Sequence, residues 1–258
     1  MIKEEEKFLN SCVFEGMSSI SALIKAIESG KNDRKIINVI VDSEKRNSKS
    51  REIAFLNYKA KELNFNIQFA DKSLIDSVTT GNSHGGIIAQ CSDRNIEALS
   101  EKNISENGVY FMFEGIEDPY NFGYSVRSLY AAGVDGVILP PRNWMSAAGV
   151  VARSSAGSSE LIDMFIAEPL DAIDVFSSLG YKVICAGIRD SESVFEADLK
   201  KPLLVILGGE KRGISRAVLE KADKVIRIDY GREFNGSLSS AAATAVFAFE
   251  ILRNNKNL

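Results

Sequence analysis

Asn121 and Arg127 lie in a predicted helix at positions where a purely structural helix needs neither side chain. The stretch NFGYSVRSLYAAG, residues 121–133, has apolar residues at helical spacing and ends in a glycine. The guanidinium of Arg127 is permanently protonated, so it can stabilise negative charge but is a poor proton acceptor. Arg127 is therefore a candidate for electrostatic catalysis. The alternative is a helix arginine held in a salt bridge.

Two further loops combine glycines or small residues with polar side chains. LGGEKRGIS, residues 207–215, has paired glycines that let a ligand approach the backbone, but it lacks the spacing of a Walker phosphate loop or a dinucleotide fingerprint. IDYGREFNGSLSSAAATA, residues 228–245, ends in small residues that permit close packing, and Ser237 is a plausible helix N-cap. A glycine turn, tight helix packing and a dimer interface are the structural alternatives.

Apolar runs alternate with helical patterns from residue 109 onward, as is typical of a parallel sheet covered by helices. Strands are predicted over residues 109–115, 136–140, 163–167, 182–187, 202–210 and 224–229. Helices are predicted over residues 121–132, 145–155, 169–179, 214–221 and 237–253. Ligands bind at the carboxyl ends of parallel strands, so we expect the three loops to converge on one site.

Residues 17–90 read as a smaller α/β domain that precedes this sheet. Helices are predicted over residues 17–30 and 51–64, and strands over residues 36–42, 66–70 and 85–90. The stretch 91–108 is polar and reads as a linker or a loosely packed helix. We therefore divide the chain into domains at residues 1–92 and 109–258, joined by a linker at 93–108.

The composition is that of an ordinary globular protein, with 258 residues, 45% hydrophobic and 26% charged. No apolar run is long enough to span a membrane, and the acidic N-terminus is not a secretory signal. Three cysteines are scattered singly, which argues against disulfides or a zinc site and for the reducing cytoplasm. His84 is the only histidine, so a histidine-centred metal site is not expected.

The net charge of −4 indicates no general affinity for nucleic acid, so an RNA partner would need a local basic patch. Residues 43–51 offer such a patch, with Lys45, Arg46, Lys49 and Arg51 against a single acidic residue. This stretch is either a solvated loop or a site that binds RNA phosphates without reading sequence.

Taken in order, the three loops resemble the motifs of the SpoU (TrmH-type) family of RNA ribose 2'-O-methyltransferases, in the SPOUT superfamily. The first motif resembles DPYNFGYSVRSLYAAGVDGVIL, the second LVILGGEKRGIS and the third IRIDYGREFNGSLSSAAATAVFAFE. RSSAGSSE, residues 153–160, resembles the family segment between the first two motifs. GNSHGGIIAQ, residues 81–90, resembles the end of the family's ribosomal-protein-like substrate-binding domain.

The resemblance implies a small N-terminal ribosomal-protein-like α/β domain and a C-terminal parallel-sheet α/β-knot domain with a trefoil knot. It further implies S-adenosylmethionine as cofactor and rRNA or tRNA as substrate. The small-residue helix at 237–253 has more apolar residues than one face of a monomer core needs, which predicts a homodimer formed by the C-terminal domain. No metal is expected. Asn121 and Arg127 match the family's substrate-side pair. The implied cofactor-binding residues are Leu207, Gly208, Gly209, Glu210, Gly213, Ile228, Ser237, Leu238 and Ser239.

The third motif departs from the family pattern Ser-Leu-Asn-x-Ser, because Ser239 replaces the asparagine and Ala241 replaces the second serine. Asp229 also stands where a proline is usual. The leading hypothesis is a cytoplasmic RNA 2'-O-methyltransferase. The alternative is a catalytically silent RNA-binding relative that keeps the knotted fold, and a third is another nucleotide-using α/β enzyme.

Overall fold

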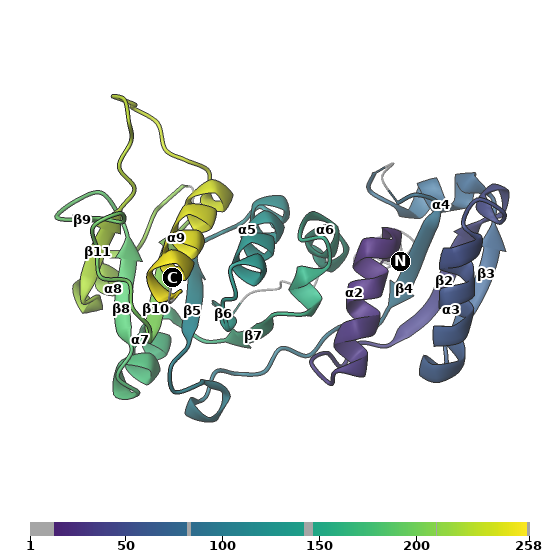
Figure 1. Ribbon diagram of the computed structural model, residues 1–258, viewed down its shortest axis with the longest axis horizontal. Coiled ribbons are helices and arrows are strands. Elements are labelled where there is room, and N and C mark those ends of the chain that lie inside the picture. Colours follow the sequence, from purple (N-terminus) through teal and green to yellow (C-terminus); the bar gives the residue numbers. More distant parts are fainter. Residues whose placement is uncertain (1–12, 82–83, 142–146, 210, 257–258) are drawn as a thin grey trace. The chain divides into compact units, whose positions relative to one another are not determined.

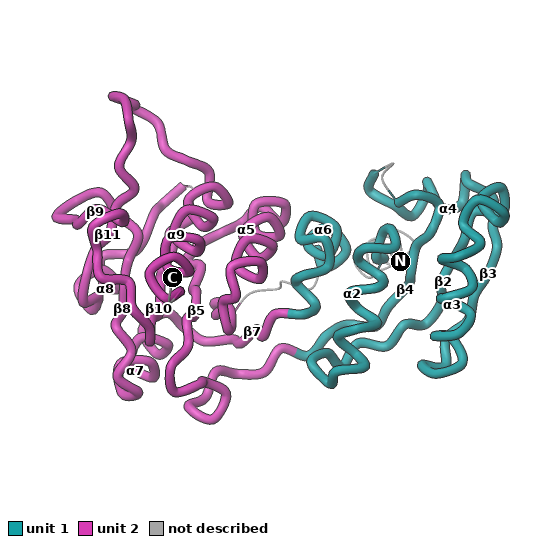
Figure 2. Tube along the Cα trace, viewed as in Figure 1, with its two compact units in different colours: residues 1–95, 143–161 teal, residues 96–142, 162–258 magenta. Residues whose placement is uncertain are grey.

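The computed structural model describes residues 13–81, 84–141, 147–209 and 211–256. Its contacts divide the chain into two compact units (Figure 2). Unit 1 comprises residues 1–95 and 143–161, and unit 2 comprises residues 96–142 and 162–258. None of the described helices is long and apolar enough to cross a membrane.

Unit 1 is built on a four-stranded sheet in the order β1-β4-β2-β3. Strands β2 and β3 run parallel, whereas β4 is antiparallel to both β1 and β2. The carboxyl ends of β1, β2 and β3 therefore lie at one edge of this sheet. Its elements are β1 (Val13–Glu15), α2 (Gly16–Glu28), β2 (Ile36–Asp42), η1 (Ser43–Lys45), α3 (Ser50–Leu63), β3 (Asn66–Ala70), α4 (Lys72–Val78), β4 (Ile87–Cys91), α6 (Ala148–Ser154) and η4 (Ser158–Glu160).

The segment with α6 and η4 follows strand β6 of unit 2 in sequence but packs in unit 1. Ala148 and Ala152 join the unit 1 core around Phe14 and Leu23. This differs from the predicted division, in which residues 109–258 form one domain. Sequence periodicity reports that a helix has an apolar face, but not which core that face joins.

Two ion pairs with buried carboxylates hold the same segment in unit 1. The Arg153 guanidinium donates to Glu15 over 2.8 Å, and the Arg34 guanidinium donates to Glu160 over 2.9 Å. Asn32 also donates to Glu160, over 2.6 Å. Because a buried carboxylate needs partners for its charge, these contacts make the segment an integral part of unit 1.

Unit 2 is built on a seven-stranded sheet in the order β7-β6-β5-β10-β8-β11-β9, and every neighbouring pair is parallel (Figure 1). This confirms the predicted helix-covered parallel sheet. Its elements are η2 (Glu101–Asn103), β5 (Val109–Glu114), α5 (Pro119–Ala131), β6 (Gly136–Leu139), β7 (Asp163–Ile166), α7 (Pro169–Ser178), β8 (Lys182–Ala186), β9 (Glu192–Ser193), β10 (Leu203–Gly208), α8 (Arg216–Lys221), β11 (Lys224–Arg227) and α9 (Ser240–Asn255).

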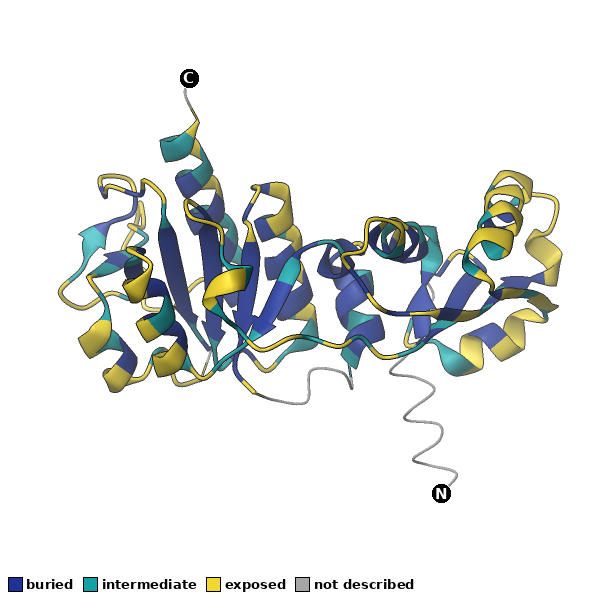
Figure 3. Cartoon of the chain, turned by 90° about the horizontal axis from the view of Figure 1, so that it is seen from below, coloured by how far each residue is buried: buried dark blue, intermediate teal, exposed yellow. Residues whose placement is uncertain are grey.

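The two faces of this sheet are covered by different helices, and the strands between them are buried (Figure 3). Tyr110 of β5 packs with Phe176 of α7 and Val218 of α8 on one face. Phe113 of the same strand meets Phe122 of α5 edge to face on the other, with ring centroids 5.7 Å apart. Alternate residues of a strand point to opposite faces, which is why β5 is apolar throughout.

The polar stretch predicted as a linker is partly ordered against the sheet of unit 2. Ala98 forms a parallel bridge with Ile166, and the Leu99 N–H donates to the Ile166 carbonyl over 2.9 Å. Residues 97–99 thus extend the edge at β7. A two-residue pairing has too few apolar positions to show a period in the sequence.

Candidate active site

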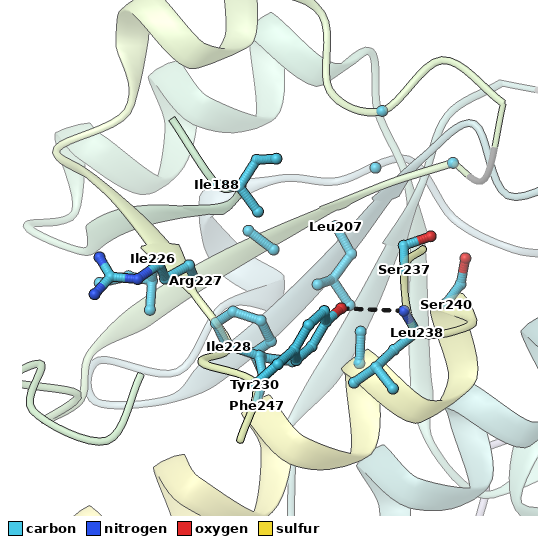
Figure 4. Close-up of a pocket in the computed structure, with 16 residues that line it drawn as sticks. Ile188, Leu207, Ile226, Arg227, Ile228, Tyr230, Ser237, Leu238, Ser240 and Phe247 are labelled. Carbon is cyan, nitrogen blue, oxygen red and sulfur yellow. Dashed lines mark hydrogen bonds between the residues drawn. The ribbon is translucent and has the colours of Figure 1, made fainter. Parts of the chain in front are cut away.

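A pocket of about 350 Å³ lies at the carboxyl ends of three adjacent strands of unit 2 (Figure 4). These strands are β8, β10 and β11, which are neighbours and parallel. The first turns of α9 complete the walls. The lining residues are Ala186, Gly187, Ile188, Leu207, Gly208, Gly209, Gly213, Ile226, Arg227, Ile228, Tyr230, Ser237, Leu238, Ser240, Ala243 and Phe247.

The glycines after β10 form a tightly packed backbone turn on one side of this pocket. A Cβ on Gly208 would lie 2.4 Å from the Gly213 backbone, and a Cβ on Gly209 would lie 2.2 Å from the Gly115 carbonyl oxygen. The Gly213 N–H donates to the Gly209 carbonyl over 3.0 Å. The glycines therefore let backbone pack directly on backbone at this wall, and Gly208, Gly209 and Gly213 line the pocket without side chains of their own.

The loop that follows β11 is fixed to the start of α9 by its own hydrogen bond. The Leu238 N–H donates to the Tyr230 hydroxyl over 3.2 Å (Figure 4). The helix N-cap is Ser239, whose hydroxyl accepts from the Ala242 N–H over 3.2 Å. The expectation of Ser237 as the N-cap is therefore wrong by two residues, because the helix begins at Ser240.

Arg227 and Asp229 form an ion pair at the rim of the pocket. The Arg227 Nε lies 2.7 Å from a carboxylate oxygen of Asp229, and the same guanidinium donates to the Ser191 carbonyl. Hydrogen bonds from the Ser193 hydroxyl and the Arg227 guanidinium hold the pKa of Asp229 below its ordinary value. The acidic side chain that stands where the family has proline is thus held as a charged carboxylate.

The two predicted substrate-side residues lie on α5 rather than in the pocket lining. Arg127 is exposed, and no hydrogen bond or ion pair joins it to another residue in the described part of the chain. The salt-bridge alternative therefore has no support within the described residues. Asn121 is half-buried, and its carbonyl accepts from the Ser125 hydroxyl over 2.8 Å.

Helix α5 packs directly against α9, so the first motif is held beside the third. Ser125 and Thr244 are fully buried at this contact, and their hydroxyl oxygens lie 3.3 Å apart. Small side chains let the two helices approach closely. Asp118 caps α5 by accepting from the Tyr120 N–H over 3.1 Å.

Most residues of the predicted cofactor set line this pocket. Ser239 does not, and Glu210 lies outside the described residues. The second and third loops converge on the pocket, as expected. The first loop does not line the pocket, but Gly115 at its start packs against Gly209 of the glycine turn. The lining residues outside the predicted set are Ala186–Ile188, Ile226, Arg227, Tyr230, Ser240, Ala243 and Phe247. Gly187, which ends the strand predicted at 182–187, could have indicated a ligand site at that strand end. The sequence did not show that this strand lies between β10 and β11 in the sheet.

The predicted RNA-binding cations lie in unit 1. Lys45, Arg46 and Arg51 are exposed, whereas Lys49 is half-buried and pairs with Glu52 over 2.8 Å. Lys49 also lines a polar cavity of about 360 Å³ with Arg153 and His84. The His84 Nδ1 accepts from the Gly86 N–H over 3.1 Å, so this ring is held as part of a turn. Within the described residues, no group of three or more histidine, cysteine, aspartate or glutamate side chains could hold a metal ion.

Family comparisons match both parts of the chain. The model described as SpoU rRNA Methylase family matches residues 108–249, and the model described as RNA 2'-O ribose methyltransferase substrate binding matches residues 15–97. The chain belongs to the SpoU rRNA Methylase family. The range matched by the SpoU rRNA Methylase model includes α5 and most of the residues that line the pocket.

Curated SpoU relatives resemble the chain over most of their length. A putative TrmH family tRNA/rRNA methyltransferase of Staphylococcus saprophyticus is 30% identical, over 72% of this chain and 77% of that protein. The 23S rRNA (guanosine-2'-O-)-methyltransferase RlmB of Blochmanniella floridana is 26% identical, over 93% of this chain and 96% of that protein.

Solved structures of SpoU relatives share the fold. An S-adenosylmethionine-bound rRNA methyltransferase from Sinorhizobium meliloti matches with a TM-score of 0.77 and 20% identity, over 99% of this chain and 95% of that chain. A crystal structure of an RNA 2'-O ribose methyltransferase matches with a TM-score of 0.79 and 20% identity, over 98% and 95% of the two chains.

Proposed function

We propose that this protein transfers a methyl group from S-adenosylmethionine to a ribose 2'-hydroxyl of rRNA or tRNA. The observation that carries this proposal is the pocket at the ends of β8, β10 and β11, which gathers the second and third SpoU motifs. We assign methyl transfer to the C-terminal unit and RNA recognition, through Lys45, Arg46, Lys49 and Arg51, to the N-terminal unit.

The pocket suits this cofactor. Its volume of about 350 Å³ is in the range of small-ligand sites. Ile226 and Phe247 supply apolar walls for a flat base, and the turn at Gly208 and Gly209 supplies backbone groups with no side chain in the way. Leu207, Gly213, Ile228, Ser237 and Leu238 complete the proposed contacts. When bound, S-adenosylmethionine supplies an activated methyl group.

Arg127 has the role of stabilising negative charge on the ribose oxygen as its proton leaves. A ribose hydroxyl is a poor nucleophile, and a permanent cation beside it favours the alkoxide. The guanidinium cannot act as a free base, so the proton goes elsewhere, to an RNA phosphate in this proposal. Asn121, one turn and a half earlier on α5, orients the same substrate. Alignment by these groups is the protein's own contribution.

The test is methyl transfer from radiolabelled S-adenosylmethionine to total rRNA and tRNA, followed by mapping of ribose methylation. We expect incorporation at one or a few riboses that are unmodified in RNA from a strain lacking the protein. Calorimetry measures cofactor binding separately. Absence of binding at millimolar cofactor would rule out the proposal.

A catalytically silent RNA-binding relative is the second candidate, and Ser239 favours it. The family's asparagine is replaced there, and the serine hydroxyl accepts from the Ala242 N–H as the cap of α9. Ser239 does not line the pocket. RNA binding together with cofactor binding but without methyl transfer would select this candidate.

We further propose a homodimer formed by the C-terminal unit, a trefoil knot in that unit, and a cytoplasmic location. Support for the dimer comes from aromatic side chains exposed on the paired helices α5 and α9, with Tyr124 and Phe249 each 48% exposed. The buried thiols of Cys91 and Cys185 suit a reducing compartment. Light scattering tests the dimer, and a monomer at micromolar concentration would contradict it.

A further inference from the structure

A basic loop is fixed in one conformation at the carboxyl ends of β2 and β3 in unit 1. The buried Asp42 carboxylate accepts from the Glu44 N–H over 3.0 Å and so caps the turn η1. The Ser43 hydroxyl donates to the Ala70 carbonyl at the end of β3 over 3.1 Å. The loop therefore presents its side chains from a preorganised backbone, which lowers the entropy lost on binding.

Two side chains of this edge stack on each other while remaining accessible. The Arg46 guanidinium carbon lies 4.7 Å from the centroid of the Phe69 ring. Phe69 is on β3, an edge strand of the sheet, and is 39% exposed. Arg46 is exposed as well, so this side chain is accessible to a ligand.

The charge around this stack favours a polyanion. Lys45, Arg46 and Arg51 are exposed in the described structure, and Lys49 lies in the same loop. The stem of Lys45 is held close to Gly86, because a Cβ on that glycine would lie 3.0 Å from the Lys45 Cγ. Planar cations backed by aromatic rings are the groups on which unpaired nucleobases stack, and lysines beside them bind the flanking phosphates.

We propose that Arg46 and Phe69 form a stacking platform for one unpaired nucleobase of the RNA substrate, with Lys45 on an adjacent phosphate. The base lies on the outer face of the guanidinium, and Phe69 supports the inner face. A base within a duplex cannot reach such a platform, so the N-terminal unit selects a loop, bulge or strand end. This inference rests on the proposed action on RNA.

A second cation–aromatic pair in unit 1, with an exposed ring and a half-buried cation, provides the control. The Lys59 ammonium lies 5.0 Å from the centroid of the Tyr58 ring, and Tyr58 is 59% exposed. Lys59 is bound by two carboxylates, Glu28 at 2.5 Å and Glu62 at 2.7 Å. Because its charge is already neutralised, this pair is not expected to bind a nucleic acid.

The experiment uses the full chain and a short unstructured RNA that carries one 2-aminopurine, whose fluorescence is quenched by stacking. Variants Phe69→Leu, Phe69→Trp, Lys45→Ala and Tyr58→Leu are compared with wild type by fluorescence and by binding affinity over a series of salt concentrations. The same RNA annealed to its complement serves as the duplex probe. Thermal melting verifies that each variant is folded. Phe69→Leu should fold, because leucine keeps most of the apolar side-chain volume at this position of the edge strand.

We expect Phe69→Leu, which removes the ring that supports the guanidinium plane, to weaken single-strand binding by about 5-fold or more, to reduce quenching and to leave the salt dependence unchanged. Phe69→Trp should retain both affinity and quenching. Lys45→Ala should keep quenching but reduce the slope of log affinity against log salt by about 0.7. Duplex affinity should be equal in wild type and Phe69→Leu, and Tyr58→Leu should behave as wild type in every measurement.

Wild-type affinity and quenching in a folded Phe69→Leu protein would overturn the platform while leaving RNA methylation intact. Equal losses in Phe69→Leu and Tyr58→Leu would also overturn it, because the effect would not be specific to this edge. If wild type binds neither single-stranded nor duplex RNA, the proposed function itself fails, and the platform fails with it.

Discussion

At the scale of single residues, the proposed chemistry depends on a guanidinium that has no partner in the described part of the protein. Arg127 is exposed on α5, a helix capped by Asp118 and packed on α9. An exposed arginine without a partner keeps its rotamer freedom and loses it only when another group immobilises it. Its environment therefore leaves the cation available for an anionic group of the substrate.

We predict that Arg127→Ala leaves cofactor affinity and melting temperature nearly unchanged but lowers turnover by about two to three orders of magnitude, the usual effect of losing one electrostatic donor. Arg127→Lys should recover little activity, because an ammonium cannot reproduce the planar fork. Single-turnover methylation and thermal melting of wild type and both variants measure this. Unchanged methyl transfer in a folded Arg127→Ala protein would refute the role.

Ser239 has a structural role that the family comparison does not predict. Its hydroxyl caps α9, so Ser239→Ala should lower the free energy of unfolding by about 0.5–2 kcal/mol, the usual loss of an N-cap. Ser239→Asn restores the family residue and keeps a good cap, so its stability should match wild type. Denaturant unfolding measures both variants. Equal stability of wild type and Ser239→Ala would show that this cap is not formed in solution.

At the scale of elements, the junction of β10 with its glycine turn defines the pocket. The Gly209 N–H donates to the Glu114 carbonyl over 2.8 Å, and Gly115 lies against the same glycine. The backbones that follow the parallel strands β5 and β10 are thus in direct contact, with no side chain between them. The close approach exists only because β5 and β10, far apart in sequence, are adjacent in the sheet.

Gly209→Ala should destabilise the protein by about 1–3 kcal/mol, the usual cost of overpacking, because its Cβ would lie 2.2 Å from the Gly115 carbonyl oxygen. Affinity for S-adenosylmethionine should fall as the turn shifts. Gly231→Ala is the control, since a Cβ there meets nothing within 4 Å. Denaturant unfolding and calorimetry measure both variants. Equal behaviour of the two would contradict the proposed packing.

At the scale of the whole molecule, the chain returns to unit 1 between two strands of unit 2. The segment with α6 and η4 brings Arg153 and Glu160 to their buried partners Glu15 and Arg34. Unit 1 therefore contains residues from both sides of the linear boundary predicted from sequence. A fragment ending at residue 95 would leave Arg34 without its carboxylate, and we expect it to be less stable than the intact chain.

Glu160→Ala tests this connection. The side chains of Glu160 and Arg34 are each 4% exposed, so removal of the carboxylate leaves a buried, unpaired guanidinium and should cost about 3–5 kcal/mol of stability. Glu220→Ala removes a surface pair with Arg216, whose side chains are 62% and 91% exposed, and should leave the melting temperature unchanged. Similar melting temperatures for both variants would argue against a buried pair in solution.

Local chemistry and periodicity in the sequence were enough to predict several features correctly. The parallel sheet of unit 2 follows from apolar runs that alternate with helical patterns, because buried strands and amphipathic helices have different periods. The family follows from three ordered motifs, and the residues after β10 and β11 were assigned to a common site because parallel strands end at one edge. These are properties of short segments, which the sequence contains directly.

Only the tertiary structure decided which distant segments meet. It placed β8 between β10 and β11, which added Ala186–Ile188 to the pocket, and it placed Phe69 beneath Arg46. It also packed α6 into unit 1. Strand order and helix docking depend on the fit between surfaces far apart in the chain, and a hydrophobic period records that a face is buried but not what buries it.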